Sequence, residues 1–193
     1  LSFHVAEQIN VLSIDGTTPN KYLDNAYTGA KYFKLEHAPA SGLNYAKFPT
    51  YQLIVLNEVG NVSSGLAQEL KTFAQNGGNV LVFPPQSANL PSYNALLQGF
   101  DGGAFGPYEP VQRQASQINT EEYVFRDVYL NKSANLRLPN TQGNFKMAPN
   151  RGEQLLTYRD GSAFLVKYPA GEGALYCCAA PLDEKISDLV RNG

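Results

Sequence analysis

The fold is decided by residues 51–86, which read YQLIVLNEVGNVSSGLAQELKTFAQNGGNVLVFPPQ. The run LIVL at 53–56 has no alternation of apolar and polar residues, which is typical of a parallel strand covered on both faces. Ser63 or Ser64 can cap a helix after it, and Gly77-Gly78 can end that helix. The apolar stripe of this helix consists of Leu66, Leu70, Phe73 and Ala74. VLVF at 80–83 predicts the next strand, and a helical crossover predicts that the two strands are parallel.

Toward the N-terminus, INVLSID at 9–15 is a short apolar run that predicts another buried strand ending in a loop. Pro19 suits the first turn of a helix that continues to about Tyr27. A second strand is predicted at Tyr32 to Leu35. We expect the apolar runs at 11–14, 53–56 and 80–83 to be adjacent and parallel at the centre of one sheet.

The C-terminal half is predicted to be rich in strands. A short helix ends at Gly99, and residues 100–119 mix Gly, Pro and Gln without periodicity, which predicts a long loop or partly ordered insertion. Strands are predicted at 136–138, 144–147, 154–158, 163–168 and 174–179, with a hairpin connection at 169–173. A final helix is predicted from near Leu182. The resulting fold class is α/β, with a mostly parallel central sheet and a β-rich C-terminal half.

The composition describes one globular domain over residues 1–193. The chain has 43% apolar residues, enough for a core, and a formal net charge of −2 with basic and acidic residues scattered along it. No basic stripe is present, so we expect no nucleic-acid partner. No apolar run approaches the roughly 18–20 residues needed to cross a bilayer. The chain begins at Leu1 without an initiator Met or a signal-peptide pattern, and we interpret it as a piece of a longer protein.

Three fragments carry a family resemblance: YQLIVLNEV, LKTFAQNGGNVLVF and YRDGSAFLVKYPAGEGALYCCAAPLD. Together they resemble the class I glutamine amidotransferase-like domains, which implies a flavodoxin-like fold with three layers. Within that superfamily the chain is similar to the extracytoplasmic domain of Bat-type, aerotolerance-related bacterial membrane proteins. This resemblance implies a location on the periplasmic side of a bacterial inner membrane, an accessory role, and membrane attachment through segments outside this chain.

The residues that carry out amidotransferase chemistry in that family are not matched here. Its active members place a cysteine in a tight turn after the strand that corresponds to residues 79–83, and a histidine late in the chain. Pro84 and Pro85 occupy this turn, where their fixed φ forbids the strained nucleophile elbow. The two histidines are His4, before the first strand, and His37, which we place in a loop after the second strand. We therefore expect no catalytic residue of the amidotransferase type.

Cofactor and metal sites are not predicted. Cys177 and Cys178 are neighbours, so on a strand their side chains point to opposite faces, and we interpret them as buried apolar residues. Neither histidine has ligand spacing to these thiols. Gly171-Glu172-Gly173 precedes a strand and lacks the helix and third glycine of a dinucleotide site, which indicates a turn.

Polar residues at the carboxyl ends of the predicted strands form a candidate cleft, because open α/β sheets bind ligands at that edge. The candidate residues are Asp15, Gly16, Thr17, Asn57, Glu58, Pro84, Pro85, Gln86 and Ser87. The favoured function is a non-catalytic module that binds a small molecule or a protein. The alternative is a hydrolase or transferase that uses Asp15, Glu58 or Ser87.

Overall fold

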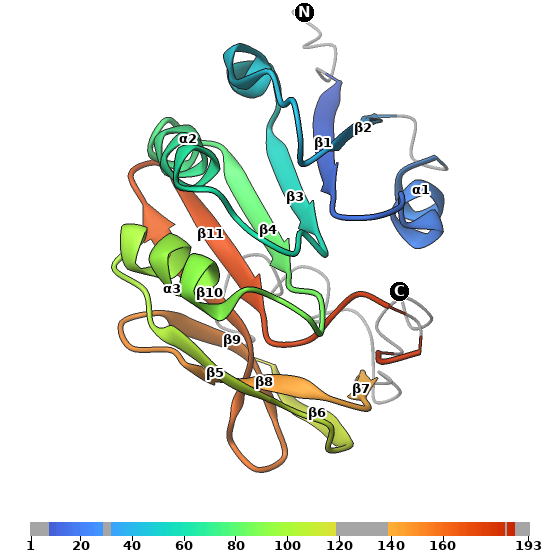
Figure 1. Cartoon of the computed structure of the whole chain (residues 1–193), viewed down its shortest axis with the longest axis vertical. Coiled ribbons are helices and arrows are strands. Elements are labelled where there is room, and N and C mark those ends of the chain that lie inside the picture. Colours follow the sequence, from blue (N-terminus) through green and yellow to red (C-terminus); the bar gives the residue numbers. More distant parts are fainter. Residues whose placement is uncertain (1–7, 29–31, 119–138, 184, 188–193) are drawn as a thin grey trace, which may run out of the picture.

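The computed structural model describes residues 8–28, 32–118, 139–183 and 185–187 (Figure 1). The strands of its main sheet lie in the order β2-β1-β3-β4-β11-β10-β9-β6-β7, and β5 pairs with β8 beside it. The strands are β1 (Ile9–Asp15), β2 (Phe33–Pro39), β3 (Leu53–Asn57), β4 (Asn79–Phe83), β5 (Ala104–Glu109), β6 (Arg113–Ile118), β7 (Asn140–Thr141), β8 (Asn144–Ala148), β9 (Glu153–Tyr158), β10 (Ala163–Ala170) and β11 (Gly173–Cys178). The helices are α1 (Lys21–Thr28), the 3-10 turn η1 (Tyr45–Thr50), α2 (Ser64–Gln75) and α3 (Leu90–Gly99).

The parallel centre of the sheet confirms the main sequence prediction. β1, β3 and β4 are adjacent and parallel, with Val11 opposite Leu53 and Leu53 opposite Asn79. β2 and β11 extend the parallel part on either side. The apolar runs of these strands supply both faces: Leu12 and Ile54 belong to the core under α2 and α3, whereas Val11 and Val55 pack on the α1 side. The fold is therefore α/β with mostly parallel core strands.

Helix α2 begins and ends where its sequence predicts. The Ser63 hydroxyl accepts a hydrogen bond from the backbone N–H of Leu66 at 3.2 Å, which is the expected N-cap. The predicted stripe of apolar residues is buried. Gly77 has a φ of +95°, and a Cβ on Gly78 would lie 2.3 Å from the ring of Phe73. The glycine pair thus ends the helix and also lets the following strand pass close beneath it.

The C-terminal half is rich in strands, as predicted, but it contains three strands that were not predicted: β5, β6 and the two-residue β7. Residues 100–119 were predicted as a loop, whereas they hold β5, which pairs with β8, and β6, which pairs with β9. Both pairings contain register shifts, so these strands show no clean alternation of apolar and polar residues. The β10–β11 hairpin at residues 169–173 is confirmed.

Two other predictions fall at the C-terminal side. The helix predicted from near Leu182 is not formed at 181–183 and 185–187, where the backbone makes a turn and Ser187 bridges to Thr141. Its remaining residues, and the strand predicted at 136–138, lie outside the described residues.

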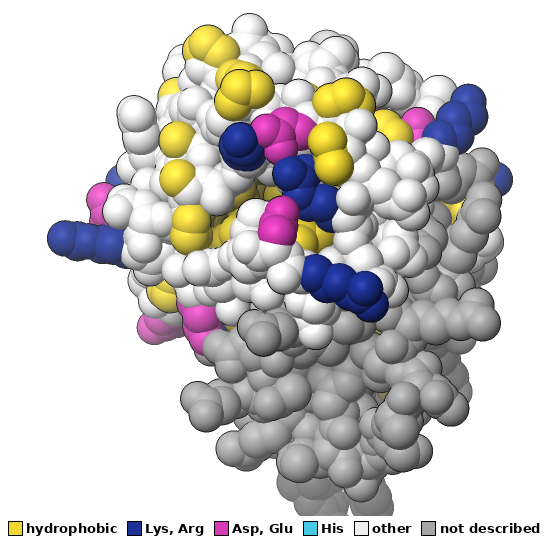
Figure 2. Space-filling model, turned by 90° about the horizontal axis from the view of Figure 1, so that it is seen from below, with side chains coloured by type: hydrophobic (Ala, Val, Ile, Leu, Met, Phe, Trp, Pro, Cys, Tyr) yellow, Lys and Arg dark blue, Asp and Glu magenta, His cyan; other side chains and the backbone are white. Residues whose placement is uncertain are grey.

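An ion-pair network ties the antiparallel strands together. Arg113 donates to Glu109 at 2.7 Å, to Asp160 at 3.0 Å and to the Asn144 amide oxygen at 2.6 Å. Lys146 pairs with the second oxygen of Glu109 at 2.8 Å. Figure 2 shows the face at the β-rich end, where basic and acidic side chains lie interspersed among apolar ones. The charges on this face therefore compensate one another locally.

Candidate functional site

The carboxyl ends of β1, β3, β4 and β11 meet at one edge of the sheet, and a hollow of about 650 Å³ opens there. We call it the strand-end hollow. It brings together most of the residues predicted for the cleft, and Pro181, Asp183 and Ile186 close its other side. The predicted residues that line it are Gly16, Thr17, Glu58, Pro85, Gln86 and Ser87. Pro84 is buried and lines no part of it.

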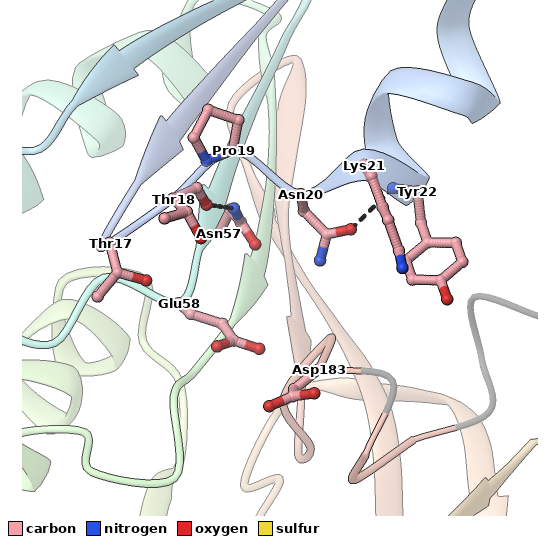
Figure 3. Close-up of a pocket in the computed structure, with 9 residues that line it drawn as sticks. All are labelled: Thr17, Thr18, Pro19, Asn20, Lys21, Tyr22, Asn57, Glu58 and Asp183. Atoms are coloured by element: carbon pink, nitrogen blue, oxygen red, sulfur yellow. Dashed lines mark hydrogen bonds between the residues drawn. The ribbon is translucent and has the colours of Figure 1, made fainter.

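A second, polar hollow of about 340 Å³ adjoins the first and shares Thr17, Glu58 and Asp183 with it (Figure 3). The β1–α1 loop supplies most of its wall. The Asn20 side chain accepts a hydrogen bond from the backbone N–H of Tyr22 at 2.9 Å, which fixes the start of α1. Figure 3 shows the side chains of Glu58 and Asp183 lying opposite one another at the mouth of this hollow.

Asp15 is the last residue of β1 and is only 6% exposed. Both oxygens of its carboxylate contact neighbouring side chains. Ser13 donates to it at 2.8 Å and the Asn57 amide at 2.7 Å. His37 Nδ1 lies 2.7 Å from its second oxygen. Burial of a carboxyl group is costly unless its oxygens have hydrogen-bond partners, and these three side chains supply them. Asp15 is therefore a structural anchor within the predicted cleft.

His37 lies on β2, so its predicted place in a loop was wrong. Its Nε2 is 2.9 Å from Asp24 of α1, so the ring bridges two carboxylates from different elements. Burial lowers the pKa of His37, but the hydrogen bonds and charges of Asp15 and Asp24 outweigh it and the net pKa is raised. The ring of His37 thus links α1 and β1 to the edge strand.

Glu58 follows β3 in a backbone conformation that side chains rarely adopt, with a φ of +55°. Its backbone N–H donates to Phe83 at 2.9 Å, and Gly16 packs so close that a Cβ there would lie 1.9 Å from the Glu58 carbonyl oxygen. Strained residues of this kind persist when their surroundings hold them, and they concentrate at functional sites. A strained turn therefore follows β3, whereas the amidotransferase-like pattern places its tight turn after β4.

The Glu58 carboxyl has an unusual environment. Its Oε1 is buried without a hydrogen-bond partner. Burial raises the pKa of Glu58 and the charge of Asp183 raises it further, against the lowering effect of backbone hydrogen bonds from Asp183 and Leu182. Glu58 therefore keeps its proton to a higher pH than an ordinary glutamate.

Ser87 lies on an exposed turn in which Ala88 N–H donates to the Pro85 carbonyl at 3.0 Å. The following helix is capped by Asn89, whose side chain accepts from Ser92 N–H at 3.0 Å. Ser87 therefore lies on the turn before α3 and does not cap that helix.

The cysteines are buried, as predicted, and their side chains lie on opposite faces of β11: Cys177 packs in the core under α2 and Cys178 in the α1-side core. Burial raises the pKa of the Cys178 thiol to about 12 and raises that of Cys177 as well. Such thiols are not nucleophiles at neutral pH. Across the described ranges, no cluster of three or more His, Cys, Asp or Glu side chains has metal-binding geometry.

Comparison with known proteins identifies the fold but does not assign the chain to a family. No protein-family model matches the chain, and no curated protein matches it. Among solved structures, the cytoplasmic protein STM1381 of Salmonella typhimurium LT2 is similar at 13% identity, with a TM-score of 0.67, over 91% of this chain and 89% of that one. A ThuA-like protein of Bacteroides uniformis is similar at 14% identity, with a TM-score of 0.63, over 93% and 84% of the two chains.

A β-galactosidase of Bacillus circulans is also similar, at 13% identity and a TM-score of 0.66, over 97% of this chain but 30% of that one. At these identities the likeness shows the fold alone. These neighbours support an α/β, flavodoxin-like fold for this chain. In the part of the chain that the structure describes, no helix has the length and apolar character of a membrane span.

Proposed function

We propose that this chain is a non-catalytic binding module whose ligand site is the strand-end hollow with the polar hollow beside it. The observation that carries the proposal is that the side chains suited to acid–base catalysis at this edge, Asp15 and His37, are already engaged by other residues. The Asp15 carboxylate is saturated by three side chains, and the His37 ring is bridged between two carboxylates. Neither can accept or deliver a proton to a substrate without dismantling the contacts that hold α1 and β2.

The side chains that do face the hollows suit recognition of a polar ligand. Thr17, Thr18 and Asn20 offer hydroxyl and amide groups, and Glu58 and Asp183 offer carboxylate oxygens. These oxygens accept hydrogen bonds, so the complementary ligand is rich in donors, such as a polyol or a primary amine. Pro85 forms a rigid lip beside them.

One observation favours a second candidate function, a hydrolase that uses the two carboxylates. Glu58 combines a strained backbone, a buried oxygen without a partner and a raised pKa, and it faces Asp183 across the hollow. A carboxyl with a raised pKa beside a second carboxyl is the arrangement of a general acid and its partner. The glycosidases among the structural neighbours do not decide this, because their likeness to the chain shows the fold alone.

We further propose a three-layer amidotransferase-like domain in the extracytoplasmic part of a Bat-type membrane protein, attached through segments outside this chain. The support is the sequence resemblance together with the flavodoxin-like frame. Reporter fusions on the full-length gene test the location. An alkaline phosphatase fused at this domain is active if the domain lies outside the cytoplasm, and a cytoplasmic signal contradicts the proposal.

Binding is tested by NMR titration of the labelled domain with three probe sets: monosaccharides, primary amines and short peptides. We expect shift changes confined to the backbone amides of the residues that line or flank the two hollows: 16–18, 20–22, 57–60, 86, 87, 182, 183 and 186. The variant Asp183→Asn should weaken binding, whereas Glu69→Gln, on α2 and away from both hollows, should not. Binding that maps elsewhere, or that Asp183→Asn leaves unchanged, contradicts the site.

A further inference from the structure

β2 is the strand at one edge of the main sheet. Among the described residues, β2 pairs only with β1, through all seven of its residues. The bonds that flank this pairing are Ile9 N–H to the Tyr32 carbonyl and Ala40 N–H to the Asp15 carbonyl. Even-numbered residues therefore direct their backbone groups toward β1. Because these directions alternate along a strand, Phe33, Leu35 and His37 direct their N–H and C=O groups outward.

Edge strands usually carry a device that prevents pairing with another chain, such as like charges or an early proline. β2 carries Pro39 at its very end and two exposed charges of opposite sign, Lys34 and Glu36. A strand with opposite charges two residues apart does not repel a copy of itself. It is complementary to that copy when the two strands run antiparallel.

We infer that β2 is a self-association surface, through which two copies of this chain join their sheets about a twofold axis at Leu35. In this register the outward backbone groups of Leu35 face those of the second copy, and Phe33 faces His37. Lys34 then lies opposite Glu36 of the second copy, twice in each dimer. A shift of the register by two residues sets Lys34 against Lys34 or Glu36 against Glu36, so charge selects one register.

Two of the three large apolar residues that are exposed in the described region lie near this edge. Of the large apolar residues exposed in the described region, Ile9 and Tyr32 lie at this end of the sheet, with exposures of 36% and 56%. In the proposed register Tyr32 lies opposite Ala38 of the second copy, which covers part of its ring. The third such residue, Val111, lies between β5 and β6.

The pairing of one short strand is a small interface, so we expect a weak, concentration-dependent dimer. Sedimentation equilibrium of the chain up to about 1 mM, the range of weak association, should show monomer and dimer. Lys34→Glu and Glu36→Lys should each weaken dimerisation about tenfold or more, because like charges then meet twice. An equimolar mixture of the two variants should regain it as a heterodimer, because the mixture restores opposite charges at all four positions.

Amide hydrogen exchange provides a second readout. The amides of Phe33, Leu35 and His37 should become protected as the chain concentration rises, while those of Lys34 and Glu36 stay protected throughout by β1. A monomer at every concentration, a mixture that fails to associate, or outward amides whose protection is independent of concentration overturns the inference. Protection of these amides at every concentration would show that another segment of the same chain covers the edge, and free exchange at every concentration would show that nothing does.

Discussion

Replacing Asp15 by Asn tests the clamp that joins β1, β2 and α1. The asparagine oxygen can still accept from Ser13 and Asn57 where the aspartate oxygen did, at 2.8 and 2.7 Å. Its amide nitrogen then faces His37 Nδ1, where it cannot accept a proton. The loss is therefore concentrated in one hydrogen bond between His37 and a carboxylate, and hydrogen bonds to charged groups are worth about 1.5–3 kcal/mol.

The pH dependence separates this cause from a general loss of packing. The folded pKa of His37 is raised, so its stabilisation is fully present below the unfolded pKa of about 6.5 and is lost as pH rises through the folded pKa. The difference in the free energy of unfolding between wild type and Asp15→Asn should therefore be largest at about pH 5.5. It should shrink at pH values well above the unfolded pKa of about 6.5.

Urea unfolding followed by far-UV circular dichroism at several pH values measures this difference, since the chain has no tryptophan for fluorescence. Ser41→Ala, on the loop after β2, is the matched control and should change little. A difference between wild type and Asp15→Asn that is independent of pH, or an Asp15→Asn variant as stable as wild type at pH 5.5, refutes the clamp.

Three further changes have definite expected results. Val55→Asp places an unpaired carboxylate at a fully buried position of β3, which costs several kcal/mol against a total stability of about 5–15 kcal/mol, so the domain should not fold cooperatively in thermal melts. Gly16→Ala brings a Cβ against the Glu58 carbonyl and should destabilise the domain by about 1–3 kcal/mol. Urea unfolding measures this loss, and NMR should show amide shift changes at 57–60. Gly42→Ala is the control for the cost of backbone strain, because Gly42 has a φ of +80° but open space around it. Glu58→Gln should leave the stability of the domain unchanged or raise it at neutral pH. The reason is that the wild-type domain becomes less stable as pH rises from about 4.3 through the raised folded pKa of Glu58. Equal pH profiles of stability for the two proteins would contradict the raised pKa of Glu58.

The parts of the fold that were predictable are those coded over short stretches. The unbroken apolar runs of β1, β3 and β4 identify buried parallel strands, and the spacing of Leu66, Leu70 and Phe73 identifies the buried face of α2. β5 and β6 escaped prediction because their pairing has register shifts, so the sequence lacks a period of two. Their strand partners, β7, β8 and β9, all come from later in the chain.

The candidate site shows the same division. The position of Asp15 and Glu58 at strand ends follows from local pattern, so their location at one edge of the sheet could be predicted. The bridge from Asp15 through His37 to Asp24 could not, because it joins three elements and depends on the register of β1 with β2, which sets Ser13 opposite His37. The positive φ of Glu58 is likewise a tertiary effect, since Gly16, which directly follows β1, makes room for its carbonyl.

The measurement that tests the central proposal most directly is covalent labelling of the folded domain. The chain is incubated with electrophilic glutamine analogues and with serine-directed phosphonates, and any adduct is located by peptide mass. We predict no adduct at Ser87 or at any residue of the two hollows, and slow labelling of Cys177 and Cys178 only when the domain unfolds. Stoichiometric modification of Ser87 in the folded domain, abolished by unfolding, would contradict the non-catalytic account.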